Sequence, residues 1–200
     1  DRASREPGSD LVSRLVHGPQ SRNLSQADYL GTAVLLLIGG NDTTRNTISG
    51  GLWELMRHPE QYQQLEDQPH LVKPAVSEMI RWVTPIAHFR RTATSEAVIS
   101  GKTIRKGEKV VLWYVSGNRD ESVFSQADIF QINRSGPRHL SFGAGIHHCI
   151  GWRLAEIQLT ALWSELLRRY PPIEPISEPS RLWSNFIHGI KHMNVLIPAG

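Results

Sequence analysis

Apolar residues recur at helical spacing in several parts of the chain, and this pattern predicts a mainly helical protein. Ser25 resembles an N-cap with Asp28 in the first turn, and the helix it begins is expected to reach about Arg57. Pro59 is expected to begin the next helix. The predicted helices cover residues 10–17, 25–57, 59–67, 71–83 and 154–170. The last is amphipathic, with a predicted stripe of Ala155, Leu159, Leu162, Leu166 and Tyr170.

Short runs rich in β-branched and aromatic residues, bounded by turn residues, predict a few strands. They lie at 89–93, 97–99, 110–114, near Leu182 and at 193–197. Residues 121–141 show little periodicity and are expected to form a long ordered meander. The fold class predicted is therefore mainly α with small β-sheets (α+β).

Composition narrows the classes of function. The 200 residues carry a net charge of +3 with no block of Lys and Arg, which argues against nucleic acid as a partner. No run of about 18 apolar residues is present, so no membrane span is expected. The first residues lack the apolar core of a secretory signal. A single cysteine excludes an internal disulfide and fits a reducing compartment, so a cytoplasmic location is expected.

That cysteine, Cys149, lies in a glycine-rich loop, Phe142–Gly151, directly before an amphipathic helix expected to begin at Ile150 or Gly151. The positive end of the helix dipole favours a thiolate over a neutral thiol. Gly143 and Gly145 allow sharp turns and close approach of the backbone to a flat, bulky group.

The residues of the loop leave four interpretations open. Cys149 is a small buried hydrophobe, as single cysteines often are. It is a nucleophile with His147 or His148 as base, although sequence neighbours seldom form such a pair. It is a zinc ligand with those histidines, although adjacent ligands suit tetrahedral geometry poorly. Or it is a thiolate ligand of haem iron.

Two further patterns are notable. Glu78 and Arg81 lie at i,i+3 on a predicted helix, a spacing that alone indicates an ordinary surface ion pair. Gly39-Gly40-Asn41-Asp42-Thr43-Thr44 lies inside the long helix. Glycine, Asp and Thr are poor interior helix residues, so the helix is expected to bend or open there. The alternative is two helices joined by a loop at Gly39-Gly40.

Together these three segments, in this order, resemble the cytochrome P450 family. The loop matches F-x-x-G-x-[HR]-x-C-x-G at every fixed position, Glu78-x-x-Arg81 resembles E-x-x-R, and Gly39–Thr43 resembles [AG]-G-x-[DE]-T. The resemblance implies haem b with Cys149 as axial iron ligand. It also implies binding of the haem by His147, Arg91, Phe142, Gly143 and Gly145, and a structural network of Glu78, Arg81 and Arg134.

The same resemblance implies a function. Asp42 and Thr43 are expected to be the catalytic acid–alcohol pair that delivers protons during oxygen activation. The mostly apolar residues expected to contact substrate are Leu35, Ile38, Gly39, Ile86, Ala87, Phe89 and Phe186. The reaction implied is hydroxylation of an apolar substrate with O2.

Three longer segments of the sequence resemble one subgroup of the family. The segments Gly39–Asn46, Trp113–Asp120 and His139–Gly143 resemble soluble bacterial P450s that hydroxylate the terminal carbon of alkanes, with His148 as a departure from that group. The partners implied are a ferredoxin and its reductase, with electrons from NAD(P)H. Alternative substrates are terpenoids, steroids or fatty acids, and a more distant alternative is a non-catalytic haem-binding protein. The resemblance also implies that residues 1–200 are the C-terminal haem-binding portion of one P450 domain, a fragment without the N-terminal half.

Overall fold

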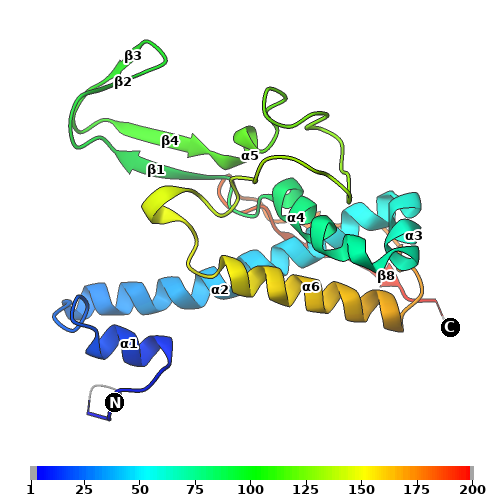
Figure 1. The fold of residues 1–200 in the computed structure, drawn as a ribbon, viewed down its shortest axis with the longest axis horizontal. Helices are drawn as coiled ribbons and strands as arrows, with labels where there is room; N and C mark the ends of the chain where they lie inside the picture. The colour runs from blue at the N-terminus through cyan, green and yellow to red at the C-terminus, as the bar shows by residue number, and fades with distance from the viewer. Residues whose placement is uncertain (1–3, 199–200) are drawn as a thin grey trace. The chain divides into compact units, whose positions relative to one another are not determined.

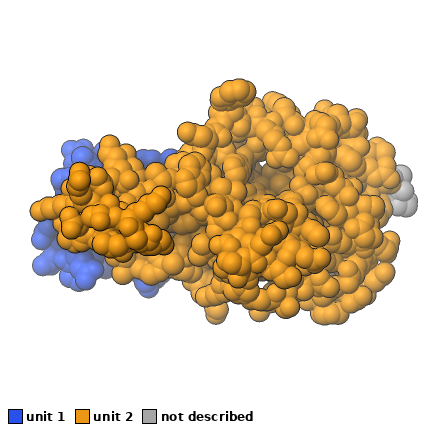
Figure 2. Space-filling view, turned by 90° about the horizontal axis from the view of Figure 1, so that it is seen from above, with its two compact units in different colours: residues 1–43 blue, residues 44–200 orange. Residues whose placement is uncertain are grey.

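The computed structural model describes residues 4–198 and divides the chain into two compact units, residues 1–43 and 44–200 (Figure 2). Its elements are six α-helices, two short 3-10 helices and eight short strands within the described residues. The fold is therefore mainly helical with small two-stranded sheets, as the sequence predicted (Figure 1).

The first unit contains α1 (Leu11–His17) and the first part of α2 (Gln26–Arg57). Asp10 caps α1 by accepting a hydrogen bond from Ser13 N at 2.9 Å. The predicted cap of α2 is also present, because Ser25 Oγ accepts from Asp28 N at 3.2 Å and donates to Asp28 Oδ2 at 2.6 Å. The chain is helical throughout 26–57, so the alternative of a loop at Gly39-Gly40 is wrong.

The core of the second unit lies where α3 (Pro59–Asp67) and α4 (Val72–Val83) pack against α6 (Trp152–Arg169) (Figure 1). α4 has a strongly amphipathic sequence, and its apolar face supplies Val76, Met79 and Ile80 to this core. The other buried members include Leu55, Tyr62, Leu65, Phe130, Ile132, Leu159 and Trp163. This cluster packs against α4 and against Phe142, the first residue of the loop before α6.

The predicted apolar stripe of α6 needs a correction. Leu159 is buried as expected, but Leu162 and Tyr170 are 37% and 47% exposed. The residue that reaches the core is Trp163, four residues after Leu159 and therefore on the same side of the helix. The helix begins at Trp152, between the start expected directly after the loop, Ile150 or Gly151, and the start of the amphipathic pattern at residue 154.

Four antiparallel two-stranded sheets and three short helical turns complete the second unit. The strand pairs are β1 (His88–Thr92) with β4 (Lys109–Trp113), β2 (Ala97–Ile99) with β3 (Lys102–Ile104), β5 (Glu174–Pro175) with β8 (Val195–Leu196), and β6 (Ser180–Arg181) with β7 (Ile190–His192). The turns are η1 (Pro69–Leu71), α5 (Tyr114–Gly117) and η2 (Gly145–His147). The sequence did not predict β3, β5 and β7, because two or three residues cannot show an alternating pattern.

Residues 121–141 contain turns and bends but no helix or strand, in agreement with the predicted meander. Within the described residues, none of the helices combines the length and the apolar character needed to cross a bilayer.

Candidate functional site

A buried ion pair on α4 organises the centre of the second unit. Glu78 and Arg81 are each 2% exposed, and they form two parallel hydrogen bonds. Arg81 Nε donates to Glu78 Oε2 at 2.7 Å and Arg81 Nη2 donates to Glu78 Oε1 at 2.8 Å. Arg81 Nη1 also donates to the carbonyls of Asn118 and Ala127, at 2.6 and 2.9 Å. Arg81 therefore fixes the backbone of the meander as well as its carboxylate partner.

Arg134 joins the same carboxylate from the meander. Its Nε donates to Glu78 Oε2 at 3.0 Å, and its other nitrogens donate to three carbonyls nearby. These acceptors are Ser125, Gln126 and Ile129, at 2.6, 3.0 and 2.6 Å. The structure thus brings together the three residues expected to form the network, with one buried carboxylate shared between two guanidinium groups.

A chain of polar contacts connects this network to the cysteine loop. α4 ends at Thr84, which is fully buried with φ of +40°. Thr84 Oγ1 donates to the carbonyl of Arg81 at 2.6 Å and accepts from Asn118 Nδ2 at 2.8 Å. Asn118 Nδ2 also donates to Ser141 Oγ at 2.9 Å, and Asn118 Oδ1 accepts from Leu140 N at 2.7 Å. Ser141 directly precedes the loop, so Asn118 transmits the position of α4 to it.

The loop itself is held through its backbone. Cys149 N donates to the carbonyl of Phe142 at 2.8 Å, and Gly143 N donates to the carbonyl of Leu140 at 2.7 Å. Gly143 has φ of +69°, and a Cβ there would lie 3.2 Å from the carbonyl oxygen of His147. Glycine is favoured at this position for two reasons. Another residue would have an unfavourable positive φ, and its Cβ would lie too close to the carbonyl oxygen of His147. Cys149 is exposed three residues before α6 begins, and His147 is exposed beside it.

Cations and aromatic rings surround the start of α6. Arg138 and Arg153 lie over the ring of Trp152, with guanidinium carbons 4.9 and 5.1 Å from its centroid. His148 meets the same ring edge-on at 5.6 Å. Arg91, by contrast, lies half-buried on β1 opposite Val110, where its Nη1 donates to the carbonyl of Arg90 at 3.0 Å.

Two segments predicted to contact substrate lie against each other, although about a hundred residues separate them in sequence. Ala87 N donates to the carbonyl of Phe186 at 2.9 Å, and the rings of Phe89 and Phe186 lie 5.8 Å apart. An isolated bridge pairs Ile86 with Ile187. Ala87 is buried, Ile86 is half-buried, and the two phenylalanine rings are partly exposed.

The remaining predicted site residues lie on α2 in the first unit. Leu35 and Ile38 are 67% and 59% exposed, and Gly39 is exposed on the same helix. Thr43 Oγ1 donates to the carbonyl of Gly39 at 2.9 Å, and both Asp42 and Thr43 are half-buried. The helix is continuous through these residues, so the expected opening is absent, and the hydrogen bond from Thr43 to the carbonyl four residues earlier is a contact within an unbroken helix.

Sequence reasoning did not identify two half-buried titratable residues near the network, His139 and Arg119. Burial, with smaller contributions from Arg138 and Arg81, lowers the pKa of His139 to about 4. Burial, and next the neighbouring charge of Arg81, lowers the pKa of Arg119 to about 10. The Arg119 guanidinium lies 3.9 Å from the centre of the Trp82 ring and donates to the Trp82 carbonyl at 2.9 Å. Only the tertiary structure reveals that they are half-buried, because no periodic pattern around either residue indicates which side of the chain faces inward.

The loop suits a thiolate ligand of a flat cofactor. Its sulfur is exposed, the backbone on either side is fixed, and two glycines with positive φ keep side chains out of the turn. Ile146 and Ile150, 97% and 79% exposed, add apolar surface next to the sulfur. Among residues 4–198, no three His, Cys, Asp or Glu side chains are grouped as a metal ion would require, so the zinc interpretation gains no support.

An exposed cysteine in a fixed glycine loop and a buried Glu-x-x-Arg pair are the features on which the resemblance to haem-thiolate proteins rests. The family model described as Cytochrome P450 matches residues 3–181, and the chain belongs to the cytochrome P450 family.

The similar proteins include one sequence relative and two solved structures. The chain is 44% identical over 192 residues to linalool 8-monooxygenase of Pseudomonas putida, covering 96% of this chain and 47% of that protein. The structure of cytochrome P450-153 from Novosphingobium aromaticivorans is 45% identical with a TM-score of 0.89, covering 94% and 48% of the two chains. CYP153D17 from Sphingomonas sp. PAMC 26605 is 43% identical with a TM-score of 0.90, covering 98% and 49%. The chain therefore spans about half the length of the relatives it matches.

Proposed function

We propose that this protein is the haem-binding part of a monooxygenase that hydroxylates an apolar substrate with O2. The observation that carries the proposal is the continuous set of contacts from the Glu78–Arg81–Arg134 network through Thr84, Asn118 and Ser141 to the Cys149 loop. Such a scaffold holds a thiolate in one position while leaving its sulfur accessible.

In this proposal Cys149 holds haem b, and the bound haem supplies the activation of dioxygen. His147 and Arg91 supply positive charge for its carboxylates, and Gly143 and Gly145 allow the loop to approach its face. Asp42 would pass protons to the Thr43 hydroxyl, and that hydroxyl would donate them toward the site where dioxygen is activated. The carbonyl of Gly39 accepts the hydrogen bond of that hydroxyl in the present structure, so Thr43 must exchange this partner during turnover.

The proposed substrate is an aliphatic molecule, oxidised at a terminal or near-terminal carbon. Support comes from the apolar wall of Ile86, Ala87, Phe89 and Phe186 and from the likeness to two P450-153 structures. Leu35, Ile38 and Gly39 are proposed to contribute from α2. Terpenoid alcohols are the second candidate, since a relative at 44% identity is a linalool 8-monooxygenase.

A ferredoxin with its reductase is the proposed electron source. The positive charges of Arg138 and Arg153 beside Trp152, close in sequence to Cys149, suit an acidic partner protein.

Spectroscopy of the whole polypeptide tests the ligand assignment. After reduction and addition of carbon monoxide, we expect the red-shifted Soret band of thiolate-ligated haem, and we expect Cys149→Ala to abolish it. A folded Cys149→Ala protein that keeps the band contradicts the assignment. So does a parent protein with the band typical of histidine ligation.

Replacement of Thr43 tests the proton-delivery role. Thr43→Ala is expected to keep the thiolate spectrum and to lower the yield of hydroxylated product per O2 consumed, because one proton donor is lost. The measurement is O2 uptake against product formation with an alkane substrate. Thr44→Ala, the same change one residue later, is the control. Unchanged coupling in Thr43→Ala argues against the role of Thr43.

A further inference from the structure

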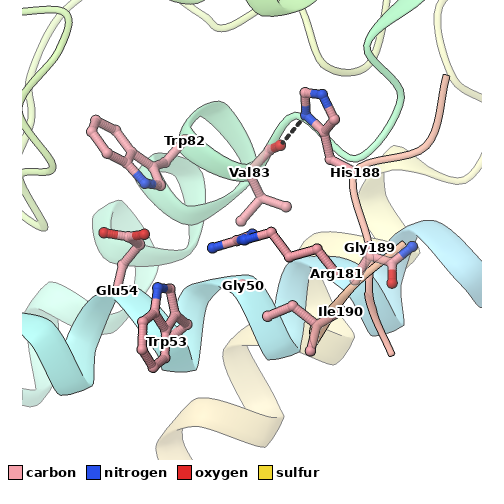
Figure 3. A pocket seen from close by; sticks show the side chains of 10 residues that line it. Gly50, Trp53, Glu54, Trp82, Val83, Arg181, His188, Gly189 and Ile190 are labelled. Carbon is pink, nitrogen blue, oxygen red and sulfur yellow. Dashed lines mark hydrogen bonds between the residues drawn. The ribbon is translucent and has the colours of Figure 1, made fainter. Parts of the chain in front are cut away.

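A second pocket lies away from the cysteine loop and uses none of the residues assigned to haem. It occupies about 310 Å³ between α2, the end of α4 and the β6–β7 hairpin (Figure 3). That volume suits a small molecule. The residues around it are Asn46, Gly50, Trp53, Glu54, Trp82, Val83, Arg181, His188, Gly189 and Ile190.

Glu54 is the unusual member of this set. It is 7% exposed, yet its Oε2 atom is buried without a hydrogen-bond donor. Arg57 forms a long ion pair with this oxygen: its Nη1 lies 3.8 Å away, beyond hydrogen-bond distance, on a side chain that is 56% exposed. A buried carboxylate oxygen without a donor is costly. An ammonium group entering the pocket would supply the missing donor.

Three other polar groups of the pocket, the Arg181 guanidinium and the indole nitrogens of Trp53 and Trp82, are donors. Figure 3 shows the Arg181 guanidinium pointing into the space toward Glu54, with the nitrogen-bearing edges of Trp53 and Trp82 also facing it. Indole nitrogens and guanidinium groups donate hydrogen bonds and accept none. Arg119, stacked at 3.9 Å on the Trp82 ring, keeps that indole in position. The pocket therefore places one carboxylate and several hydrogen-bond donors within one small volume, with the side chains of Asn46 and His188 also in its lining.

This division matches a ligand that carries both charges. We propose that the pocket binds a small zwitterion of the amino-acid class, with its ammonium group on Glu54 and its carboxylate on Arg181 and the indole nitrogens. Val83 and Ile190 supply apolar surface for an aliphatic side chain. His188, whose Nδ1 lies 3.3 Å from the carbonyl of Val83, lines the same space. The inference stands apart from the haem assignment.

Calorimetric titration of the whole polypeptide tests the inference with three matched probes. L-leucine carries both charges, 3-methylbutylamine lacks the carboxylate, and 4-methylpentanoate lacks the ammonium group. We expect leucine to bind at least tenfold more tightly than either analogue. Absence of binding by leucine, or equal affinity for all three probes, overturns the proposal.

Two substitutions assign the contacts. Glu54→Gln is expected to weaken leucine binding at least tenfold while leaving 4-methylpentanoate unaffected. Arg181→Gln, on an exposed strand residue, is expected to weaken leucine and 4-methylpentanoate but not 3-methylbutylamine. Glu60→Gln, the same change as Glu54→Gln on the exposed face of α3, is the control. Leucine affinity that survives Glu54→Gln, or that survives Arg181→Gln, overturns the proposal.

Discussion

Two arginine–glutamate pairs in this chain have the same spacing in sequence and the same shortest N–O distance, but one pair is buried and the other is exposed to solvent. Glu78–Arg81 on α4 and Glu165–Arg168 on α6 are both i,i+3 pairs with a shortest N–O distance of 2.7 Å. The side chains of the first are at most 2% exposed, and those of the second more than half exposed. The exposed carboxylate still responds to its partners, since hydrogen bonds from Arg168 and then Arg169 lower the pKa of Glu165 to about 2. The comparison teaches that geometry alone does not distinguish a structural centre from a surface contact.

The strongest test of this comparison removes one arginine from each pair. Arg81→Ala leaves the Glu78 carboxylate buried with one guanidinium fewer, and we expect it to lower the free energy of unfolding by about 3–5 kcal/mol. We further expect no haem incorporation. Arg168→Ala should leave the unfolding midpoint unchanged, because water replaces the lost partner. Urea denaturation of both variants is the measurement. A stable, haem-containing Arg81→Ala protein would show that burial does not make the first pair essential.

His139 sharpens the comparison, because burial, and next the charges of Arg138 and Arg81, disfavour its protonated form near the network. Its pKa in the folded state is about 4, below the ordinary value of 6.5, so the unfolded chain binds more protons between these values. The contribution of His139 to stability is therefore complete above pH 6.5, falls as the pH is lowered toward 4, and changes no further below that. The loss amounts to at most about 3 kcal/mol.

The measurement is the free energy of unfolding from pH 7 to pH 4 for the parent and for His139→Gln. We expect the substitution to flatten this profile, and we expect His70→Gln, at an exposed position, to leave it unchanged. An equally steep profile in His139→Gln would assign the acid sensitivity to other groups.

The smallest expected effect separates two glycines of the cysteine loop, a region held by backbone contacts rather than by buried charge. Gly143 and Gly145 both have positive φ, but only at Gly143 would a Cβ approach the carbonyl of His147. We expect Gly145→Ala to cost about 1 kcal/mol of stability and Gly143→Ala somewhat more, about 1–3 kcal/mol. Thermal unfolding with and without added haemin measures the difference. Equal losses would show that backbone conformation alone matters at Gly143.

The sequence was informative where a regular pattern or a specific motif was present. It predicted α1, α2, α3, α4 and α6 to within a few residues, and the strands β1, β2, β4, β6 and β8. It also selected Glu78, Arg81 and Arg134, which the structure brings into contact. The i,i+3 spacing alone favoured a surface pair, and only the resemblance to a family suggested that this pair is buried.

Other parts of the site could not be predicted for physical reasons. Asn118, Thr84 and Ser141 meet through contacts between positions 23 to 34 residues apart, which no local pattern encodes. The burial of His139 and Arg119 depends in the same way on how the meander folds over α4. Trp163 was missed because the stripe was drawn through Leu162, one residue from the position that faces the core.

The hydrogen bonds that join residues 85–87 to residues 186–188 have a consequence for how the proposed substrate-contacting segments can change in evolution. Ala87 N to Phe186 O and His188 N to Pro85 O tie the segment after α4 to the tip of the last hairpin. An insertion or deletion in one of these two segments would shift the hydrogen-bond register of the other segment. The two segments are therefore expected to change together in evolution. Exchanging only one of the two segments between relatives should break the hydrogen bonds between them. Exchanging both segments together should keep these hydrogen bonds and transfer the substrate preference.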